Sequence, residues 1–217
     1  MTSSAAASPD PSAADLIPEF WEERYQTGST RWDLGQPAPT FIHLLSEMGA
    51  TNRIAPGRAI ILGCGRGHDA LWFARHGFEV TGVDYAPSAI AAAQASASAA
   101  GLSATFLQRD IFDLLPAYRS RFDYVIEHTC FCAIAPHLRD RYVDLVHQLL
   151  RPGGQLIGIF FTHQRPGGPP YGVTPQAVQQ FFSRRFLIHH LGPAPRSPLQ
   201  RQGEEHLGIF GHQENPN

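Results

Sequence analysis

Short apolar runs alternate with amphipathic stretches along most of this chain, and the alternation predicts its elements. Strands are predicted in the apolar runs at residues 59–62, 79–83, 104–108, 124–127 and 155–161. Between these runs, apolar positions recur at helical spacing in residues 68–76, 88–100 and 136–150. Strands that alternate with helices predict an α/β fold with a parallel, doubly wound sheet.

Further elements flank this central region. Two short helices are predicted before the first strand, over residues 17–27 and 39–48. After a loop rich in Gly and Pro, residues 174–183 are predicted to be helical, and residues 186–191 and 206–210 to form two closing strands. The sequence LLRPGG predicts a helix end followed by a tight turn into the fifth strand.

The length of the chain suits one domain with one hydrophobic core. We expect this domain to span residues 16–217, and residues 1–15, rich in Ala, Ser and Pro, to form a disordered lead-in. All 17 basic residues are Arg, and the formal net charge is −2. No basic patch therefore indicates a nucleic-acid partner.

The cysteine, histidine and hydropathy patterns argue against several classes of protein and of metal site. Cys64, Cys130 and Cys132 lack CxxC spacing, which argues against a disulfide framework or a structural zinc site. The histidines show no metal-binding spacing, so no metal is expected. We find no secretory signal and no apolar run of membrane-spanning length. A cytoplasmic protein without a membrane partner, monomeric or a small homo-oligomer, is expected.

A glycine-rich turn, LGCGRG, follows the first predicted strand. Gly63, Gly65 and Gly67 allow the backbone to turn tightly and to approach a ligand closely. Asp84 ends the next strand about 20 residues further on, where an acid can accept hydrogen bonds from both ribose hydroxyls. The unit therefore predicts a site for an adenosine-containing ligand.

The glycine spacing separates two cofactor classes. A dinucleotide site needs G-x-G-x-x-G, whereas Gly67 is followed here by His68, Asp69 and Ala70. Asp69 at the start of the helix would repel a pyrophosphate and attract a cationic amino-acid group. S-adenosylmethionine carries such a group and no phosphate, and the pattern resembles motif I of class I methyltransferases. A NAD site and a turn without a ligand are the less favoured readings.

The carboxyl ends of the next strands carry further candidates, because ligands of open α/β sheets bind there. Tyr85 follows Asp84, and the third strand is followed by Asp110, Ile111 and Phe112. Asp110 matches the position where methyltransferases bring an acid and backbone amides to the adenine amino group. The fourth strand ends in EHTCFCAI, residues 127–134, which faces the transferable methyl group in this architecture.

Several motifs occur in a fixed order between Phe20 and about Phe182. They are WxxRY, WDLGQPAP, LGCGRGHDA, EHTCFCAI, RPGG and GGPPY. Together they resemble the thiol and halide methyltransferases of the thiopurine methyltransferase superfamily. The resemblance implies a Rossmann-like class I methyltransferase fold, with a mostly parallel seven-stranded sheet and an antiparallel last strand. It also implies S-adenosylmethionine as cofactor and S-adenosylhomocysteine as product.

The resemblance assigns roles to the aromatic residues. In that family, Trp-containing N-terminal segments fold over the methionine end of the cofactor, so residues 16–50 are expected to form a helical cover. This implies roles for Trp21 and Trp32, with Asp33 as a further candidate. Aromatic faces suit a sulfonium cation, and Phe131 is a further wall candidate; core packing is the alternative for these rings. Trp32 and Phe131 would also contact the acceptor.

A second covering segment is predicted in the loop GGPPYGV. Its glycines supply hinges, its prolines stiffen it, and Tyr171 would offer a ring or a hydroxyl to the acceptor. A plain surface turn is the alternative.

His128 is the predicted catalytic residue. Plant halide and thiol methyltransferases of this resemblance have Asp-Tyr where this chain has Glu127-His128, which leaves the acceptor open. Glu127 is placed with the cofactor-binding residues. The imidazole could take the proton of a thiol or donate a hydrogen bond to an anion. A histidine satisfied by backbone hydrogen bonds is the alternative.

The sequence thus predicts a methyltransferase that acts on a small-molecule acceptor, a small sulfur nucleophile such as hydrosulfide or a thiol, with halide ions as secondary acceptors. Direct displacement needs no covalent enzyme intermediate, so positioning and exclusion of water supply most of the acceleration. An aromatic thiol or a selenium or tellurium oxyanion is the alternative acceptor. A regulator that binds S-adenosylmethionine without catalysis is the alternative of another class.

Overall fold

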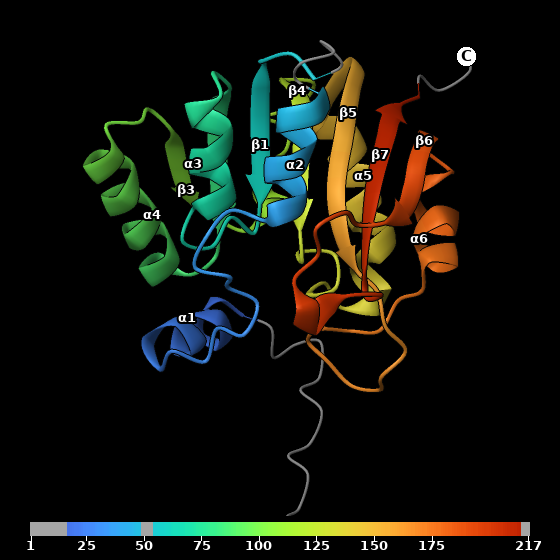
Figure 1. Cartoon of the computed structure of the whole chain (residues 1–217), viewed down its shortest axis with the longest axis horizontal. Coiled ribbons are helices and arrows are strands. Elements are labelled where there is room, and N and C mark those ends of the chain that lie inside the picture. The colour runs from blue at the N-terminus through green and yellow to red at the C-terminus, as the bar shows by residue number, and fades with distance from the viewer. Residues whose placement is uncertain (1–16, 49–53, 214–217) are drawn as a thin grey trace, which may run out of the picture.

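The computed structural model describes residues 17–48 and 54–213 and contains one seven-stranded sheet (Figure 1). Its strand order is β3-β2-β1-β4-β5-β7-β6. The strands are β1 (Arg58–Leu62), β2 (Glu79–Asp84), β3 (Thr105–Gln108), β4 (Phe122–His128), β5 (Leu150–Phe161), β6 (Phe186–Pro193) and β7 (Glu205–His212). The lead-in expected for residues 1–15 lies outside the described residues.

The sheet is mixed because its last strand is inserted. β7 pairs antiparallel with both β5 and β6, whereas β1 to β5 pair in parallel. This confirms the expected doubly wound fold with an antiparallel last strand.

Helices cover both faces of the sheet. The helices are α1 (Pro18–Gln26), α2 (Pro39–Met48), α3 (His68–Arg75), α4 (Pro87–Ala100), α5 (Arg139–Leu149) and α6 (Pro175–Phe182). Ala59 and Ile61 of β1 face a core shared with α2, α3 and α4, whereas Ile60 and Leu62 face a core shared with α5 and α6. Burial on both faces explains why the central strands are continuous apolar runs.

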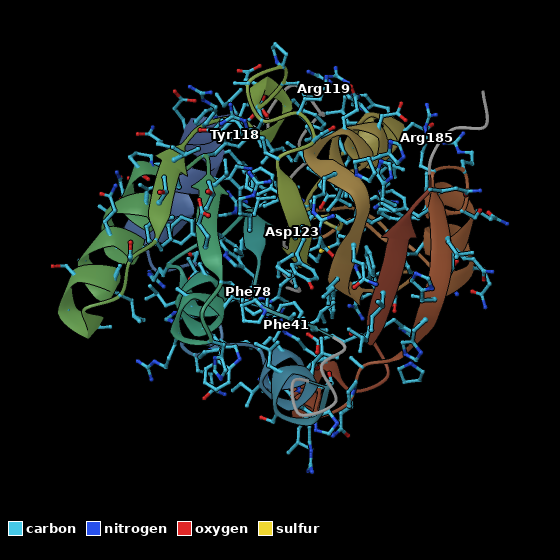
Figure 2. The ribbon with its side chains drawn as sticks, turned by 90° about the horizontal axis from the view of Figure 1, so that it is seen from above. Phe41, Phe78, Tyr118, Arg119, Asp123 and Arg185 are labelled. Atoms are coloured by element: carbon cyan, nitrogen blue, oxygen red, sulfur yellow. The ribbon has the colours of Figure 1, made fainter. Side chains whose placement is uncertain are left out.

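The first of these cores is rich in aromatic rings. Phe41 of α2 contacts Phe73 of α3 at a centroid distance of 5.5 Å, and Phe73 contacts Phe78 at 5.1 Å. Phe41 and Phe78 are labelled on this side of the sheet in Figure 2. These contacts anchor α2, the second of the two N-terminal helices, directly on the sheet.

The structure corrects one expected turn. The LLRPGG sequence was predicted to place a tight turn between the helix and the fifth strand, but β5 begins at Leu150 and includes these residues. Gly153 has a φ of +75°, and the pairing register shifts between Phe122 and Tyr124 on β4. An irregular strand start therefore replaces the turn.

Three segments gather at the edge where the parallel strands end. Figure 1 shows α1 below this edge, together with the loop after β5 and the excursion between β6 and β7. That excursion contains the short helix η5 (Leu199–Arg201). No helix among the described residues is long and apolar enough to cross a bilayer.

Candidate active site

A cavity of about 770 Å³ opens at the carboxyl ends of β1, β2 and β4. Most of the residues selected from the sequence line it: Trp21, Trp32, Gly63, Asp84, Tyr85, Asp110, Ile111, Phe112 and His128. They come from five separate stretches of chain. The fold therefore collects the predicted chemistry at one place, at the edge of the sheet where ligands of doubly wound folds bind.

The glycine-rich turn shapes one wall of the cavity. Gly63 lines it at a φ of +64°, and a Cβ there would lie 3.2 Å from Cys130 Sγ. Gly67, at a φ of +81°, would bring a Cβ to 2.9 Å from Ala93 Cβ. Gly65 and Gly67 are not part of the cavity lining. A Cβ at Gly65 would lie 3.1 Å from the Tyr25 hydroxyl, and Gly67 lets the start of α3 pack closely against α4, whereas Gly63 faces the cavity.

Asp84 ends β2 and presents a buried carboxylate to the cavity. Its Oδ2 accepts from the Gly65 N–H at 2.8 Å, and its Oδ1 accepts from the Ala86 N–H at 3.0 Å. Burial raises the pKa of Asp84 against the opposing effect of these hydrogen bonds. Each carboxylate oxygen has a further acceptor site, so Asp84 can also bind a pair of hydroxyls.

The turn after β3 forms the adjacent part of the wall. Asp110 caps the short helix η3 (Ile111–Asp113), and its Oδ1 accepts from the Phe112 N–H at 2.8 Å. Burial and a hydrogen bond with Asp110 raise the pKa of Tyr85. The Arg141 guanidinium lies 4.3 Å from the centroid of the Phe112 ring. This part of the wall thus combines an apolar ring with acidic and amide groups.

The N-terminal segment covers the cavity with aromatic rings. Trp32 lies edge-on to both Trp21 and Tyr25, with centroid distances of 5.6 and 5.7 Å, and its Nε1 donates to the Tyr25 hydroxyl at 3.3 Å. Glu22 accepts from the Ser88 N–H at 2.9 Å, which ties α1 to the start of α4. The cover is therefore held by polar contacts as well as by ring packing.

Asp33, a further candidate on this cover, is not part of the cavity lining. Burial acts to raise its pKa, but hydrogen bonds from the Gly35 N–H and from Arg66 outweigh burial and lower it. Asp33 thus ties the cover to the glycine-rich turn through Arg66 instead of facing a ligand.

His128 lies at the end of β4 and forms a pair with Asp69. Its Nδ1 lies 2.8 Å from Asp69 Oδ2, and each side chain is 12% exposed. Its Nε2 is buried and has no hydrogen-bond partner among the described residues. Burial acts to lower the pKa of His128, but the Asp69 carboxylate outweighs burial and raises it.

Asp69 corrects the role expected from the sequence. We expected its carboxylate to attract the cationic group of the cofactor, but Asp69 is not part of the cavity lining. Its Oδ1 accepts from the Ala38 N–H at 2.7 Å, and its Oδ2 contacts His128. Both oxygens thus bind groups of the protein itself.

Glu127 and Phe131 also lie elsewhere than expected. Glu127 is 0% exposed, and its Oε1 accepts from the Phe131 N–H at 2.8 Å. The Phe131 ring is 1% exposed and packs against Tyr142, Phe160 and Phe182. Both residues therefore stabilise the turn after β4 from inside the core. Cys130, Cys132 and their neighbours line the cavity instead.

Tyr171 turns away from the cavity as well. It is 9% exposed, its N–H donates to the Cys132 carbonyl at 2.6 Å, and its carbonyl oxygen accepts from Arg139 at 3.1 Å. Pro169 and Pro170 of the same loop line the cavity. The loop reaches the site as expected, but through its prolines.

Arg201 is the main site residue that the sequence did not reveal. It lines the cavity from the excursion between β6 and β7, where the sequence shows only proline-rich loop composition. Its guanidinium donates to the carbonyl oxygens of Arg31 and Trp32, at 3.2 and 2.8 Å, and pairs with Glu205 at 3.2 Å. Arg201 lies far along the chain from Arg31 and Trp32, and no local sequence signal predicts contacts between such distant residues.

Several known proteins are similar to this chain. The profile of the thiopurine S-methyltransferase family matches residues 16–216. The chain is 32% identical over 192 residues to probable thiol methyltransferase 2 of Arabidopsis thaliana, covering 84% of this chain and 82% of that protein. It is 31% identical over 209 residues to thiocyanate methyltransferase 1 of Brassica oleracea, covering 92% and 90%.

A solved structure supports the fold. The 1,6-didemethyltoxoflavin-N1-methyltransferase of Burkholderia thailandensis, solved with bound S-adenosylhomocysteine, superposes with a TM-score of 0.75 at 20% identity. The match covers 96% of this chain and 94% of that one.

Proposed function

Since this chain belongs to the thiopurine S-methyltransferase family, we propose that it transfers a methyl group to hydrosulfide or a small thiol, and more slowly to halide ions. It is an S-adenosylmethionine-dependent methyltransferase of sulfur nucleophiles. The volume and the lining of the cavity bear on which sulfur acceptor the enzyme uses.

The residues present fit the cofactor. Gly63 leaves a cradle at the end of β1 that a Cβ would begin to fill, and Asp84 offers acceptor sites for a ribose diol. Asp110 and the apolar side chains of Ile111 and Phe112 suit an adenine ring. The Trp21 and Trp32 rings suit a sulfonium cation. These are the residues that would hold S-adenosylmethionine.

The observation that carries the small acceptor is the size of the cavity. Its volume of about 770 Å³ must hold both cofactor and acceptor. Pockets for a single drug-sized ligand measure about 300–1,000 Å³. The cofactor is itself a ligand in this size range and would take much of the cavity, which favours a small acceptor over a large one.

The chain's own residues supply positioning, exclusion of water and a proton acceptor. When bound, S-adenosylmethionine supplies an electrophilic methyl group and leaves as a neutral thioether. The cover and the Pro169–Pro170 loop surround the acceptor, which favours one approach direction. His128 lines the cavity, and its Nε2, which is buried and has no hydrogen-bond partner among the described residues, is the nitrogen that can take the proton of a thiol. Hydrosulfide and halide ions need no such step.

We also propose the setting in which the enzyme acts. Three free cysteines suit a reducing cytoplasm. We take the chain as one domain over residues 16–217, monomeric or a small homo-oligomer, without nucleic-acid or membrane partners. Of the described part of the cover expected over residues 16–50, only residues 17–32 lie at the cavity, because α2 packs on the face of the sheet. The net charge of −2 and the absence of Lys support the exclusion of nucleic acid.

The test is incubation of the purified protein with S-adenosylmethionine and separate pools of hydrosulfide, small thiols, aromatic thiols, iodide, and selenium or tellurium oxyanions. S-adenosylhomocysteine and volatile methyl products are followed, with a cofactor-free reaction as control. Fastest conversion of hydrosulfide or a small thiol supports the proposal. Preference for an aromatic thiol or an oxyanion overturns the small-sulfur assignment. Cofactor-dependent thermal stabilisation without turnover indicates a regulator.

A further inference from the structure

Asp69 occupies a position that joins three parts of the molecule. It lies in the first turn of α3, directly after the glycine-rich turn. One oxygen accepts from the Ala38 N–H, directly before α2, and the other contacts His128 at the end of β4. A carboxylate in the first turn of a helix is stabilised by the helix dipole. A negative charge therefore stands on the Nδ1 side of the imidazole.

This contact determines which nitrogen of His128 carries the proton. A carboxylate oxygen can only accept, so the hydrogen bond requires a proton on Nδ1. In the neutral ring the lone pair then lies on Nε2, the nitrogen that has no partner among the described residues. The Phe41 ring lies edge-on to the imidazole, with centroids 6.0 Å apart. Both the tautomer and the ring orientation are thus fixed.

We infer that Asp69 is a positioning residue that makes His128 Nε2 the base for acceptors that arrive protonated. The inference rests on the proposed function and gives Asp69 a role in choosing among its acceptors. Asp69 also accepts from the Ala38 N–H, so the same carboxylate links His128 to the segment that leads into α2.

A neutral thiol forms a bond from its sulfur to the transferred methyl carbon, and the electrons of the broken carbon–sulfonium bond stay on the cofactor's sulfur. The thiol proton moves to Nε2, and the resulting imidazolium is stabilised by the Asp69 carboxylate. The products are a methyl thioether, S-adenosylhomocysteine and protonated His128, which returns its proton to solvent.

Other charged groups act on His128 from β7 and η5. Glu205 acts in the same direction as Asp69 and favours the imidazolium, whereas Arg201 opposes it. These two residues pair with each other, so their effects largely offset one another. Asp69 is the charged group that contacts the imidazole directly and controls its tautomer.

The role of Asp69 can be tested by comparing acceptors that carry a transferable proton with acceptors that carry none. Iodide and thiocyanate carry no transferable proton and bypass the base, whereas a neutral thiol at a pH well below its own pKa requires it. The variant Asp69→Asn keeps the shape and an oxygen for Ala38, but its amide can donate to Nδ1 and leave the proton on Nε2. His128→Gln removes the base itself.

Asp123→Asn is the matched control. Asp123 is also largely buried, accepts from a backbone N–H, that of Arg58, and pairs with Arg151. It lies at the start of β4, whereas the cavity opens at the carboxyl end of that strand, beside His128.

We would measure kcat/KM for a neutral thiol and for iodide in each variant, and the His128 tautomer by ¹⁵N NMR of the cofactor-free protein. Asp69→Asn and His128→Gln should each lower kcat/KM for the thiol about 100-fold more than kcat/KM for iodide. The NMR spectrum of Asp69→Asn should show the proton on Nε2, and Asp123→Asn should match the wild type. Equal losses for both acceptors, or an unchanged tautomer, overturn the inference.

The NMR measurement tests the role of Asp69 independently of the proposed function, because it needs no turnover. If the wild-type protein methylates none of the offered acceptors, the proposed function fails. A proton on Nδ1 of His128 that moves to Nε2 in Asp69→Asn would then still support the positioning role. A wild-type proton on Nε2 would overturn it whichever acceptor is used.

Discussion

The Arg201 guanidinium donates a hydrogen bond to the backbone carbonyl oxygen of Trp32 at 2.8 Å, across 169 positions of the chain. It also donates to the Arg31 carbonyl oxygen and pairs with Glu205, which is 2% exposed. The excursion between β6 and β7 therefore binds the backbone of the N-terminal cover through Arg201. Two segments from opposite ends of the sequence close one site.

Replacing Arg201 by Leu should destabilise the protein strongly. The change leaves Glu205 buried without its charged partner, for which about 3 kcal/mol of unfolding free energy is expected. Urea unfolding measures this loss. Arg184→Leu is the control, because Arg184 and Asp140 are 61% and 63% exposed and such pairs contribute less than about 1 kcal/mol. A similar small effect for both variants would contradict the role of Arg201.

Glu127 should make stability depend on pH. Complete burial raises its pKa to about 7, above the model-peptide value of 4.5. A raised acid pKa means that folding favours the protonated form, so stability is greatest below about pH 4.5 for this group and falls as pH rises through about 7.

Glu127→Gln should remove this pH dependence, because its amide is never charged and its oxygen can still accept from the Phe131 N–H. The difference in unfolding free energy between variant and wild type is measured between about pH 5 and pH 8. It should move in favour of the variant as pH rises. A difference that is constant with pH would show that Glu127 does not titrate in this range.

Gly63→Ala should weaken cofactor binding by more than its effect on stability explains. Its φ of +64° strains any other residue, and the new methyl would lie 3.2 Å from Cys130 Sγ at the cavity wall. Gly101→Ala is the matched control, because Gly101 has a φ of +63° with nothing within 4 Å.

Both variants should lose about 1 kcal/mol of stability from the left-handed backbone. Only Gly63→Ala should reduce the affinity for S-adenosylmethionine in calorimetric titration. Equal affinities in the two variants would mean that the turn at Gly63 does not contact the ligand.

The sequence predicts the sheet and the meeting of Gly63, Asp84 and Asp110 at one cavity, for a physical reason. Apolar runs determine which strands are buried, and the carboxyl ends of parallel strands share one edge of a sheet. Gly63, Asp84 and Asp110 therefore meet without any knowledge of distant contacts.

The acceptor side is harder to predict, because side-chain directions there depend on irregular backbone. Thr129 has a φ of +60°, which ends the regular alternation of β4 and turns Phe131 into the core. The contact of Asp69 with His128 joins residues 59 positions apart, and helical spacing does not reveal it. Arg201 reaches the cavity from the excursion between β6 and β7, whose proline-rich composition predicts a loop but no contact with the cavity.

Asp84→Asn should lower the affinity for S-adenosylmethionine at least about tenfold, since hydrogen bonds to a charged acceptor contribute about 1.5–3 kcal/mol. Asn has one acceptor oxygen where Asp84 uses two, so it cannot satisfy the Gly65 and Ala86 N–H groups and still accept from both hydroxyls of a ribose. Calorimetric titration gives the affinity. Asp144→Asn on α5, whose side chain is 48% exposed in its pair with Arg185, serves as the control. If Asp84→Asn bound the cofactor as tightly as the control, the buried carboxylate would serve the turn alone, and the ribose would have to be held by other groups of the cavity.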